Sequence, residues 1–129
     1  MLNVMIVEDS DFVRAILRNL LLDIGGIALS GEYVAAPAAI SALRVNPPDV
    51  VLLDIQLEQG SGMDVMNVVR NEHSDVKVIV VSNSPEEAIR TSYLAAGAYR
   101  FYDKSFEIRS LRKKLARLAF PETDVEDIC

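Results

Sequence analysis

Val50-Val51-Leu52-Leu53 is an unbroken apolar run that ends at an aspartate, Asp54. A second run, Val76-Lys77-Val78-Ile79-Val80-Val81, is almost as uniformly apolar. Strands that are buried on both faces have this composition, and the strands of parallel sheets are covered on both faces by helices. These two segments therefore predict central strands of a parallel sheet.

Three further apolar runs and five helical patterns surround these segments. The other predicted strands are Leu2–Val7, Ile27–Val34 and Ala98–Tyr102. The predicted helices have apolar residues at three-and-four spacing or clear capping signals. They are Phe12–Ile24, capped by Asp9 or Ser10 and stopped by Gly25-Gly26, then Pro37–Val45, Met63–Asn71, a helix from an N-cap at Ser84 to Gly97, and Ser105–Ala119.

Strands that alternate with helices predict an α/β protein with a parallel sheet and right-handed crossovers. Helices must cover both faces of an open sheet, so we expect a doubly wound (βα)5 three-layer sandwich. By analogy with flavodoxin-like proteins, which have five such units, the expected strand order is 2-1-3-4-5. In sheets of this kind, ligands bind beyond the carboxyl ends of the strands.

Composition narrows the class of protein. The chain has 129 residues, a net charge of -6 and a single cysteine, Cys129. We expect one domain over residues 1–120 and a short acidic C-terminal tail over residues 121–129. The lone cysteine excludes an internal disulfide and favours a reduced, cytoplasmic setting. No apolar run approaches the roughly 20 residues that span a bilayer, and the acidic balance argues against a nucleic-acid-binding surface.

Acidic and polar side chains gather at the predicted strand ends. Glu8 and Asp9 follow the first strand, Asp54 the third, Ser82 the fourth and Lys104 the fifth. Carboxylates held close together repel one another, and a hard cation such as Mg²⁺ relieves that repulsion. An ammonium and a hydroxyl nearby can hold phosphoryl oxygens. This set of groups predicts phosphoryl transfer, with one carboxylate as the nucleophile.

The chain resembles the response regulator receiver domain over residues 1 to about 120. The matching segments are Val4-Met5-Ile6-Val7-Glu8-Asp9-Ser10 with Arg14, Asp49-Val50-Val51-Leu52-Leu53-Asp54, Gly60-Ser61-Gly62-Met63-Asp64-Val65, Val78-Ile79-Val80-Val81-Ser82 and Ala96-Gly97-Ala98-Tyr99-Arg100-Phe101-Tyr102-Asp103-Lys104. No single motif is very specific, but their order and separations together are strong evidence.

The resemblance implies a role for each residue. Asp54 is the implied phosphoacceptor, supplied by a phosphohistidine on a histidine kinase or a histidine phosphotransfer protein. Glu8 and Asp9 are the implied Mg²⁺ acids, and Asp54 and the backbone carbonyl of Gln56 complete the ligands. Lys104 would pair with the phosphoryl group.

The same resemblance implies a conformational switch. Ser82 would turn toward the phosphoryl group, and Phe101 takes the place of the family's switch aromatic, which moves inward. Four positions depart from the commonest family pattern: Glu58 and Ser105 each replace a frequent proline, Asn83 replaces a small residue, and Phe101 lacks a tyrosine hydroxyl. None of these departures removes a chemical group that the mechanism requires.

The last predicted helix is strongly basic. It carries Arg109, Arg112, Lys113 and Lys114, whereas the chain as a whole has a net negative charge. We hypothesise that this helix docks an acidic surface of a downstream effector protein. No DNA-binding domain fits in the residues after it, so we expect the output to be another protein or a domain outside this sequence, without direct DNA or membrane binding by this chain.

Two alternatives stay open at this point. Asp9-Ser10-Asp11-Phe12-Val13 fits the motif of haloacid dehalogenase-type phosphatases, with Asp9 as nucleophile and Asp11 as acid/base. That enzyme would leave Asp54 without a role and would need an acidic pair after the fourth strand. A flavodoxin-like cofactor carrier would need a phosphate-binding loop after the first strand. The preferred interpretation is a signalling switch rather than an enzyme.

Overall fold

The computed structural model describes residues 1–83, 86–105 and 107–122. Five parallel strands form one sheet in the order β2-β1-β3-β4-β5, which confirms the predicted topology. The strands are β1 (Leu2–Val7), β2 (Ile27–Tyr33), β3 (Val50–Leu53), β4 (Lys77–Ser82) and β5 (Arg100–Asp103). The helices are α1 (Asp11–Ile24), α2 (Ala36–Val45), α3 (Gly62–Glu72), α4 (Glu87–Ala95) and α5 (Ile108–Ala119).

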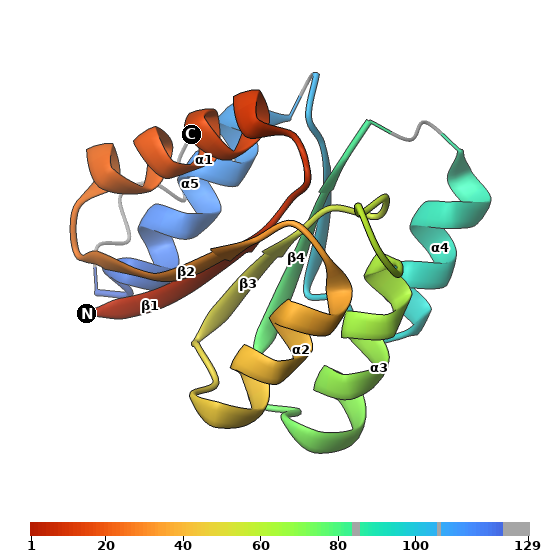
Figure 1. Ribbon diagram of the computed structural model, residues 1–129. Helices are drawn as coiled ribbons and strands as arrows, with labels where there is room; N and C mark the ends of the chain where they lie inside the picture. The colour runs from red at the N-terminus through yellow and green to blue at the C-terminus, as the bar shows by residue number, and fades with distance from the viewer. Residues whose placement is uncertain (84–85, 106, 123–129) are drawn as a thin grey trace.

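Helices cover both faces of the sheet, as the apolar strands require. Figure 1 shows α1 and α5 together on one face, with α2, α3 and α4 on the other. Successive strand residues point to opposite faces, so Val51 packs under α2 and α3 while Leu52 packs under α1 and α5. The expected three-layer sandwich is therefore confirmed.

Helix α1 ends at Ile24 as predicted and begins at Asp11, one residue before the predicted start at Phe12. Ser10 is its N-cap, and the Ser10 hydroxyl accepts a hydrogen bond from the Val13 amide at 3.3 Å. Gly25 and Gly26 follow the helix with φ values of +78° and +66°, a conformation that side chains disfavour. The Ser10 cap at the start of α1 fixes the turn that follows β1, where Glu8 and Asp9 lie.

Several predicted boundaries were displaced. The fifth strand begins at Arg100 rather than Ala98, because Arg100 is the first residue in register with Ile79 of β4. Helix α5 begins at Ile108 rather than Ser105, since the Ser105 amide donates to the Asp103 carboxylate in a turn at 2.7 Å. Helix α4 is shorter than the predicted helix from Ser84 to Gly97, because it begins at Glu87 after an N-cap at Glu86 and ends at Ala95. Ser84 itself and residues 123–129 of the tail lie outside the described residues. None of the described helices is long and apolar enough to span a membrane.

Candidate functional site

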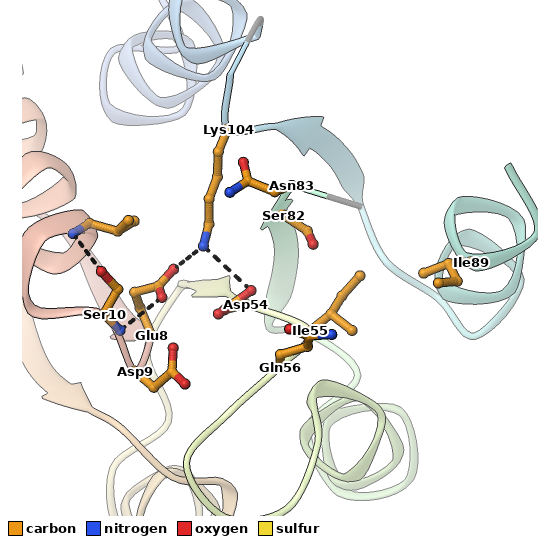
Figure 2. A pocket seen from close by; sticks show the side chains of 11 residues that line it. Glu8, Asp9, Ser10, Asp54, Ile55, Gln56, Ser82, Asn83, Ile89 and Lys104 are labelled. Carbon is orange, nitrogen blue, oxygen red and sulfur yellow. Dashed lines mark hydrogen bonds and ion pairs between the residues drawn. The ribbon is translucent and has the colours of Figure 1, made fainter. Parts of the chain in front are cut away.

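The carboxyl ends of β1, β3, β4 and β5 open into one pocket of about 500 Å³. Its lining includes all five residues singled out at strand ends: Glu8, Asp9, Asp54, Ser82 and Lys104. Figure 2 shows Lys104 reaching down between the carboxylates of Glu8 and Asp54. The structure therefore brings together side chains that are up to 96 residues apart in the chain, as the strand order predicted.

Backbone hydrogen bonds hold these residues in place. The Asp54 amide donates to the Val7 carbonyl at 2.9 Å, which extends the β1–β3 pairing and sets Asp54 beside Glu8. The Lys104 amide donates to the Ser82 carbonyl at 3.0 Å, which does the same for β4 and β5. The relative positions of the side chains are thus set by the rigid end of the sheet.

Three carboxylates form the acidic part of the pocket. One oxygen each of Glu8, Asp9 and Asp54 lies within 4.8 Å of the others. Glu8 is 1% exposed and Asp54 is 7% exposed, whereas Asp9 is exposed. The Lys104 ammonium is 2.7 Å from Glu8 Oε1 and 3.6 Å from Asp54 Oδ1. One ammonium thus faces three carboxylates, and two negative charges are left over when all four groups are ionised.

This imbalance perturbs Asp54. Burial and the negative charge of Glu8 together raise the pKa of Asp54 to about 7, although Lys104 opposes both effects. A carboxyl group with this pKa binds a proton readily near neutrality. A cation among the three carboxylates would favour the ionised form instead.

The donor set fits a hard divalent cation. Mg²⁺ takes oxygen ligands at short range and is commonly bound by one or two carboxylates together with water and phosphoryl oxygens. Glu8, Asp9 and Asp54 supply carboxylate oxygens from one cluster that carries excess negative charge. Gln56, whose backbone carbonyl is the fourth expected ligand, lines the same pocket.

Arg14 supports the acidic pair in a way that sequence reasoning missed. Its guanidinium donates to the Glu8 carbonyl at 2.9 Å and lies 3.5 Å from a carboxylate oxygen of Glu32 on β2. The Ser10 amide donates to the Glu8 carboxylate at 3.1 Å. Arg14 lies on the amphipathic helix α1, six residues after Glu8. A charged residue so close to the acidic pair was the signal in the sequence that could have indicated this supporting role.

Phe101 lies buried in the core, with 4% of its surface exposed. Its ring meets Tyr93 of α4 edge-on, with centroids 6.3 Å apart and an interplanar angle of 63°. The Arg90 guanidinium lies 4.9 Å from the ring centroid and donates to the Phe101 carbonyl at 3.1 Å. The same guanidinium pairs with Glu107 at 3.0 Å. Arg90 therefore joins α4, β5 and the start of α5.

Two of the departures from the family pattern, Asn83 and Ser105, meet at the mouth of the pocket. The Ser105 hydroxyl donates to the Asn83 side-chain carbonyl at 3.4 Å, and both residues are exposed. Ser82 is buried below them and has 5% of its surface exposed. Asn83 and Ser105 thus link the segments that follow β4 and β5.

The four basic residues of α5 that were predicted to dock a partner divide into two groups. Arg112 pairs with Asp23 of α1 at 2.8 Å, and the Lys114 ammonium lies 5.8 Å from the Tyr99 ring centroid. Arg109 and Lys113 are exposed. Among these four residues, the exposed positive charge is thus centred on Arg109 and Lys113, because Arg112 and Lys114 already make contacts within the chain.

The phosphatase alternative is not favoured. Asp11, which would be its acid/base, is outside the residues that line the pocket and pairs with Arg14 on the surface. Its side chain is 93% exposed. Asp54 instead occupies the buried position among the carboxylates, where the alternative gives it no role.

Comparisons with known proteins agree on one family. The family model described as "Response regulator receiver domain" matches residues 4–116. Response regulator UvrY of Escherichia coli (strain K12) is 33% identical over 104 residues, covering 81% of this chain and 48% of UvrY. Response regulator GacA of Pseudomonas syringae pv. syringae (strain B728a) is 29% identical over 120 residues, covering 93% of this chain and 56% of GacA. The chain spans about half the length of these curated relatives.

Solved structures match over almost the whole chain. The signal receiver domain of the putative response regulator NarL from Mycobacterium tuberculosis superposes with a TM-score of 0.83 and 26% identity, covering 92% of this chain and 95% of that one. The response regulator domain of Thermotoga maritima CheB gives a TM-score of 0.80 at 24% identity, covering 97% and 98%. The second likeness bears on the fold alone.

Proposed function

The chain belongs to the response regulator receiver domain family, and from this premise we propose that it is a phosphoacceptor switch. Asp54 takes a phosphoryl group from the phosphohistidine of a histidine kinase or a histidine phosphotransfer protein. The modified domain then contacts a downstream effector protein. The observation that carries this proposal is the convergence of Glu8, Asp9, Asp54 and Lys104 in one pocket.

Glu8, Asp9, Asp54 and the backbone carbonyl of Gln56 would hold Mg²⁺. When bound, Mg²⁺ supplies positive charge that compensates the carboxylates and the oxygens of the phosphoryl group. The carboxylate cluster and the raised pKa of Asp54 support this assignment. The nucleophile must be ionised to react, so compensating charge beside Asp54 favours the reactive form.

The transfer is a displacement at phosphorus. An oxygen of the Asp54 carboxylate forms a bond to phosphorus, while the bond from phosphorus to the donor's imidazole nitrogen breaks. The electron pair of that bond stays on the nitrogen, and the imidazole leaves neutral when its other nitrogen carries a proton. Lys104, already within 3.6 Å of Asp54 Oδ1, pairs with a phosphoryl oxygen and disperses its charge.

Reversal needs only water. A water molecule attacks phosphorus, the bond between phosphorus and the Asp54 oxygen breaks, and inorganic phosphate leaves. The carboxylate is restored without a further reagent. The protein therefore acts as a self-resetting signal rather than as an enzyme that turns over an external substrate.

Ser82 and Phe101 carry the switch in this proposal. The Ser82 hydroxyl donates to the phosphoryl group and draws the segment after β4 toward Asp54. That segment leads into α4, and α4 packs on Phe101 through Tyr93 and Arg90. Since Arg90 also pairs with Glu107, a shift of α4 reaches the start of α5.

The effector contacts the exposed basic residues of α5 in this scheme. Arg109 and Lys113 provide positive charge on a chain with a net charge of -6, so an acidic protein surface is the complementary partner. The overall negative charge gives no electrostatic support for DNA contact by this chain.

Labelling with a small phosphodonor tests the function. The protein is incubated with phosphoramidate and Mg²⁺, and the modified residue is mapped by mass spectrometry. We expect one phosphoryl group on Asp54, none in Asp54→Asn, and wild-type labelling in Asp11→Asn. Labelling of Asp9 in place of Asp54 would favour the phosphatase alternative and overturn the proposal.

A further inference from the structure

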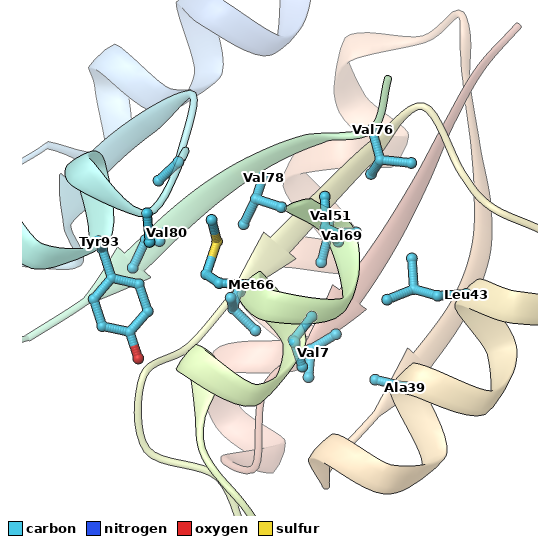
Figure 3. Packing of buried hydrophobic residues seen from close by; sticks show 14 of the residues in the cluster. Val7, Ala39, Leu43, Val51, Met66, Val69, Val76, Val78, Val80 and Tyr93 are labelled. Carbon is cyan, nitrogen blue, oxygen red and sulfur yellow. The ribbon is translucent and has the colours of Figure 1, made fainter. Parts of the chain in front are cut away.

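Tyr93 is the one side chain of α4 that lies fully in the core. It is 4% exposed, and its ring packs against the buried Phe101. Figure 3 shows the Tyr93 side chain extending from α4 past Val80 and away from the helix that carries it. A tyrosine hydroxyl that is carried into a core needs a hydrogen-bonding partner there.

The partner is the first turn of α3. Burial raises the pKa of the Tyr93 phenol, and a hydrogen bond between the Tyr93 hydroxyl and the backbone of Met63 partly opposes that rise. A bond that favours the ionised phenol has the phenol oxygen as acceptor, so the Met63 amide is the donor. Met63 is the second residue of α3, where backbone amides have no partner within their own helix.

The other amides at the start of α3 are satisfied locally. The Ser61 amide donates to the Asp64 carboxylate at 3.0 Å, and the Gly62 amide donates to the Ile55 carbonyl at 2.9 Å. The Asp64 amide contacts the Ser61 carbonyl at 3.2 Å. The Met63 amide is thus the position in this turn whose partner comes from a different helix.

Gly62 allows this close approach. A Cβ atom at position 62 would lie 2.9 Å from the Tyr93 hydroxyl and 2.9 Å from the backbone carbonyl of Asp54. Both contacts are shorter than real Cβ atoms show. The tyrosine hydroxyl and the backbone of Asp54 therefore meet on the same side of one glycine, with no side chain between them.

We infer that Tyr93 is a positioning residue that caps α3 from α4 and thereby couples the loop after Asp54 to the position of α4. The inference rests on the proposed function for the role of Asp54. A displacement of α4 removes an acceptor from the Met63 amide, and a displacement of the loop after Asp54 removes a donor from the Tyr93 hydroxyl. The hydrogen bond therefore favours conformations in which α4 and the loop after Asp54 keep their present relative position.

Amide exchange in the unmodified protein tests the cap. Tyr93→Phe removes the hydroxyl and keeps the ring, while Tyr102→Phe removes a hydroxyl from a buried tyrosine on the other face of the sheet. By NMR, we expect the Met63 amide to exchange about fivefold faster or more in Tyr93→Phe, the ratio that one hydrogen bond supports. The Leu52 amide in β3 reports global stability, and rates are compared relative to it. An unchanged Met63 rate in Tyr93→Phe overturns the inference.

The coupling is tested with the phosphomimetic BeF3⁻ and Mg²⁺ at saturating concentration. In the wild type and in Tyr102→Phe, we expect amide resonances of α4 and of Met63 to shift together. In Tyr93→Phe, the Lys104 amide still responds, whereas the α4 response falls severalfold. An equal α4 response in Tyr93→Phe overturns the coupling. If the wild-type Asp54 and Lys104 amides do not respond, the proposed function and the coupling fall together, while the exchange experiment still decides the cap.

Discussion

The Lys104 ammonium lies closer to Glu8 than to Asp54, at 2.7 Å against 3.6 Å. Glu8 is almost completely buried, so this ion pair compensates a charge that has little access to water. The same ammonium also lies beside Asp54, so in the proposed function one lysine serves both the unmodified pocket and the phosphoryl group.

Replacing Lys104 tests the structural part of this role. Lys104→Met removes the ammonium that pairs with Glu8 and leaves a buried carboxylate without its partner. We expect the free energy of unfolding without divalent cation to fall by about 3 kcal/mol at pH 8. Urea unfolding measures the change. The double variant Glu8→Gln, Lys104→Met should recover much of the loss, because it leaves no unpaired charge. Equal stabilities of the single and double variants would show that the ion pair has no structural role.

Asp54→Asn should change the pH dependence of stability. The pKa of Asp54 is raised to about 7 in the folded protein, above its ordinary value of 3.8, so the folded state holds a proton that the unfolded chain releases. Stability from this group is complete below pH 4 and is lost as the pH rises through 7. Without divalent cation, we expect the free energy of unfolding of Asp54→Asn to exceed that of the wild type by about 2 kcal/mol at pH 8 and by little at pH 4.

Thermal unfolding at pH 4, 6 and 8 follows this difference. Adding Mg²⁺ should stabilise the wild type at pH 8 and leave Asp54→Asn less affected, since a ligand that binds the folded state raises its stability. Asp11→Asn is the matched control, because Asp11 is an exposed aspartate outside the pocket. A pH-independent difference between the wild type and Asp54→Asn would contradict the raised pKa.

Asp9→Asn should weaken Mg²⁺ binding. Asp9 is the exposed member of the carboxylate cluster, so its loss removes one ligand charge and disturbs the buried residues little. We expect the dissociation constant for Mg²⁺ to rise about tenfold or more, as for the loss of about 1.4 kcal/mol of binding free energy. Isothermal titration calorimetry measures it, again with Asp11→Asn as control. Wild-type affinity in Asp9→Asn would remove Asp9 from the metal ligands.

Most of the fold could be predicted from the sequence, because the apolar composition of a strand and the glycines that end a helix are local signals of secondary structure. Val50–Leu53 is apolar at every position, and that pattern identified β3 without error. The start of β5 was misplaced because Ala98 and Tyr99 are also apolar, whereas the paired register with β4 begins at Arg100. Local composition therefore predicts that a strand exists, and tertiary register sets its ends.

The pocket could be predicted because strand order carries Glu8, Asp54 and Lys104 to one edge. The supporting residues could not. Tyr93 sits at an ordinary apolar position of a helical pattern, and nothing in the sequence indicates that its hydroxyl reaches Met63. Contacts between helices depend on where each helix packs, which periodicity does not specify.

The basic face of α5 should separate into binding and structural residues. Arg109→Glu with Lys113→Glu changes two exposed positions, so we expect unchanged Asp54 labelling and weaker retention of an acidic effector by the BeF3⁻-bound protein. Arg112→Glu opposes Asp23 and should lower stability by less than about 1 kcal/mol. Pull-down and thermal unfolding measure the two effects. Equal retention by the double variant and the wild type would dispose of this docking surface.

Gly62→Ala should lower the free energy of unfolding, although helix propensity alone predicts a gain. Alanine favours a helix over glycine, so an open site would gain stability from the change. Here the added Cβ lies 2.9 Å from the Asp54 carbonyl and 2.9 Å from the Tyr93 hydroxyl, and the backbone carbonyl cannot move aside without displacing Asp54. We expect a loss of about 1–3 kcal/mol, as for overpacking of a core.

Urea unfolding measures the stability of Gly62→Ala beside that of the control Gly97→Ala. Gly97 has nothing within 4 Å of its Cβ position but has a φ of +108°, so the control loses stability through backbone strain alone. Phosphoramidate labelling then distinguishes the two, because displacement of the Asp54 backbone slows labelling in Gly62→Ala, whereas Gly97 lies at the far end of α4. A Gly62→Ala variant that is more stable than the wild type and is labelled at the same rate would show that the glycine is not required for the approach of Tyr93 to Asp54.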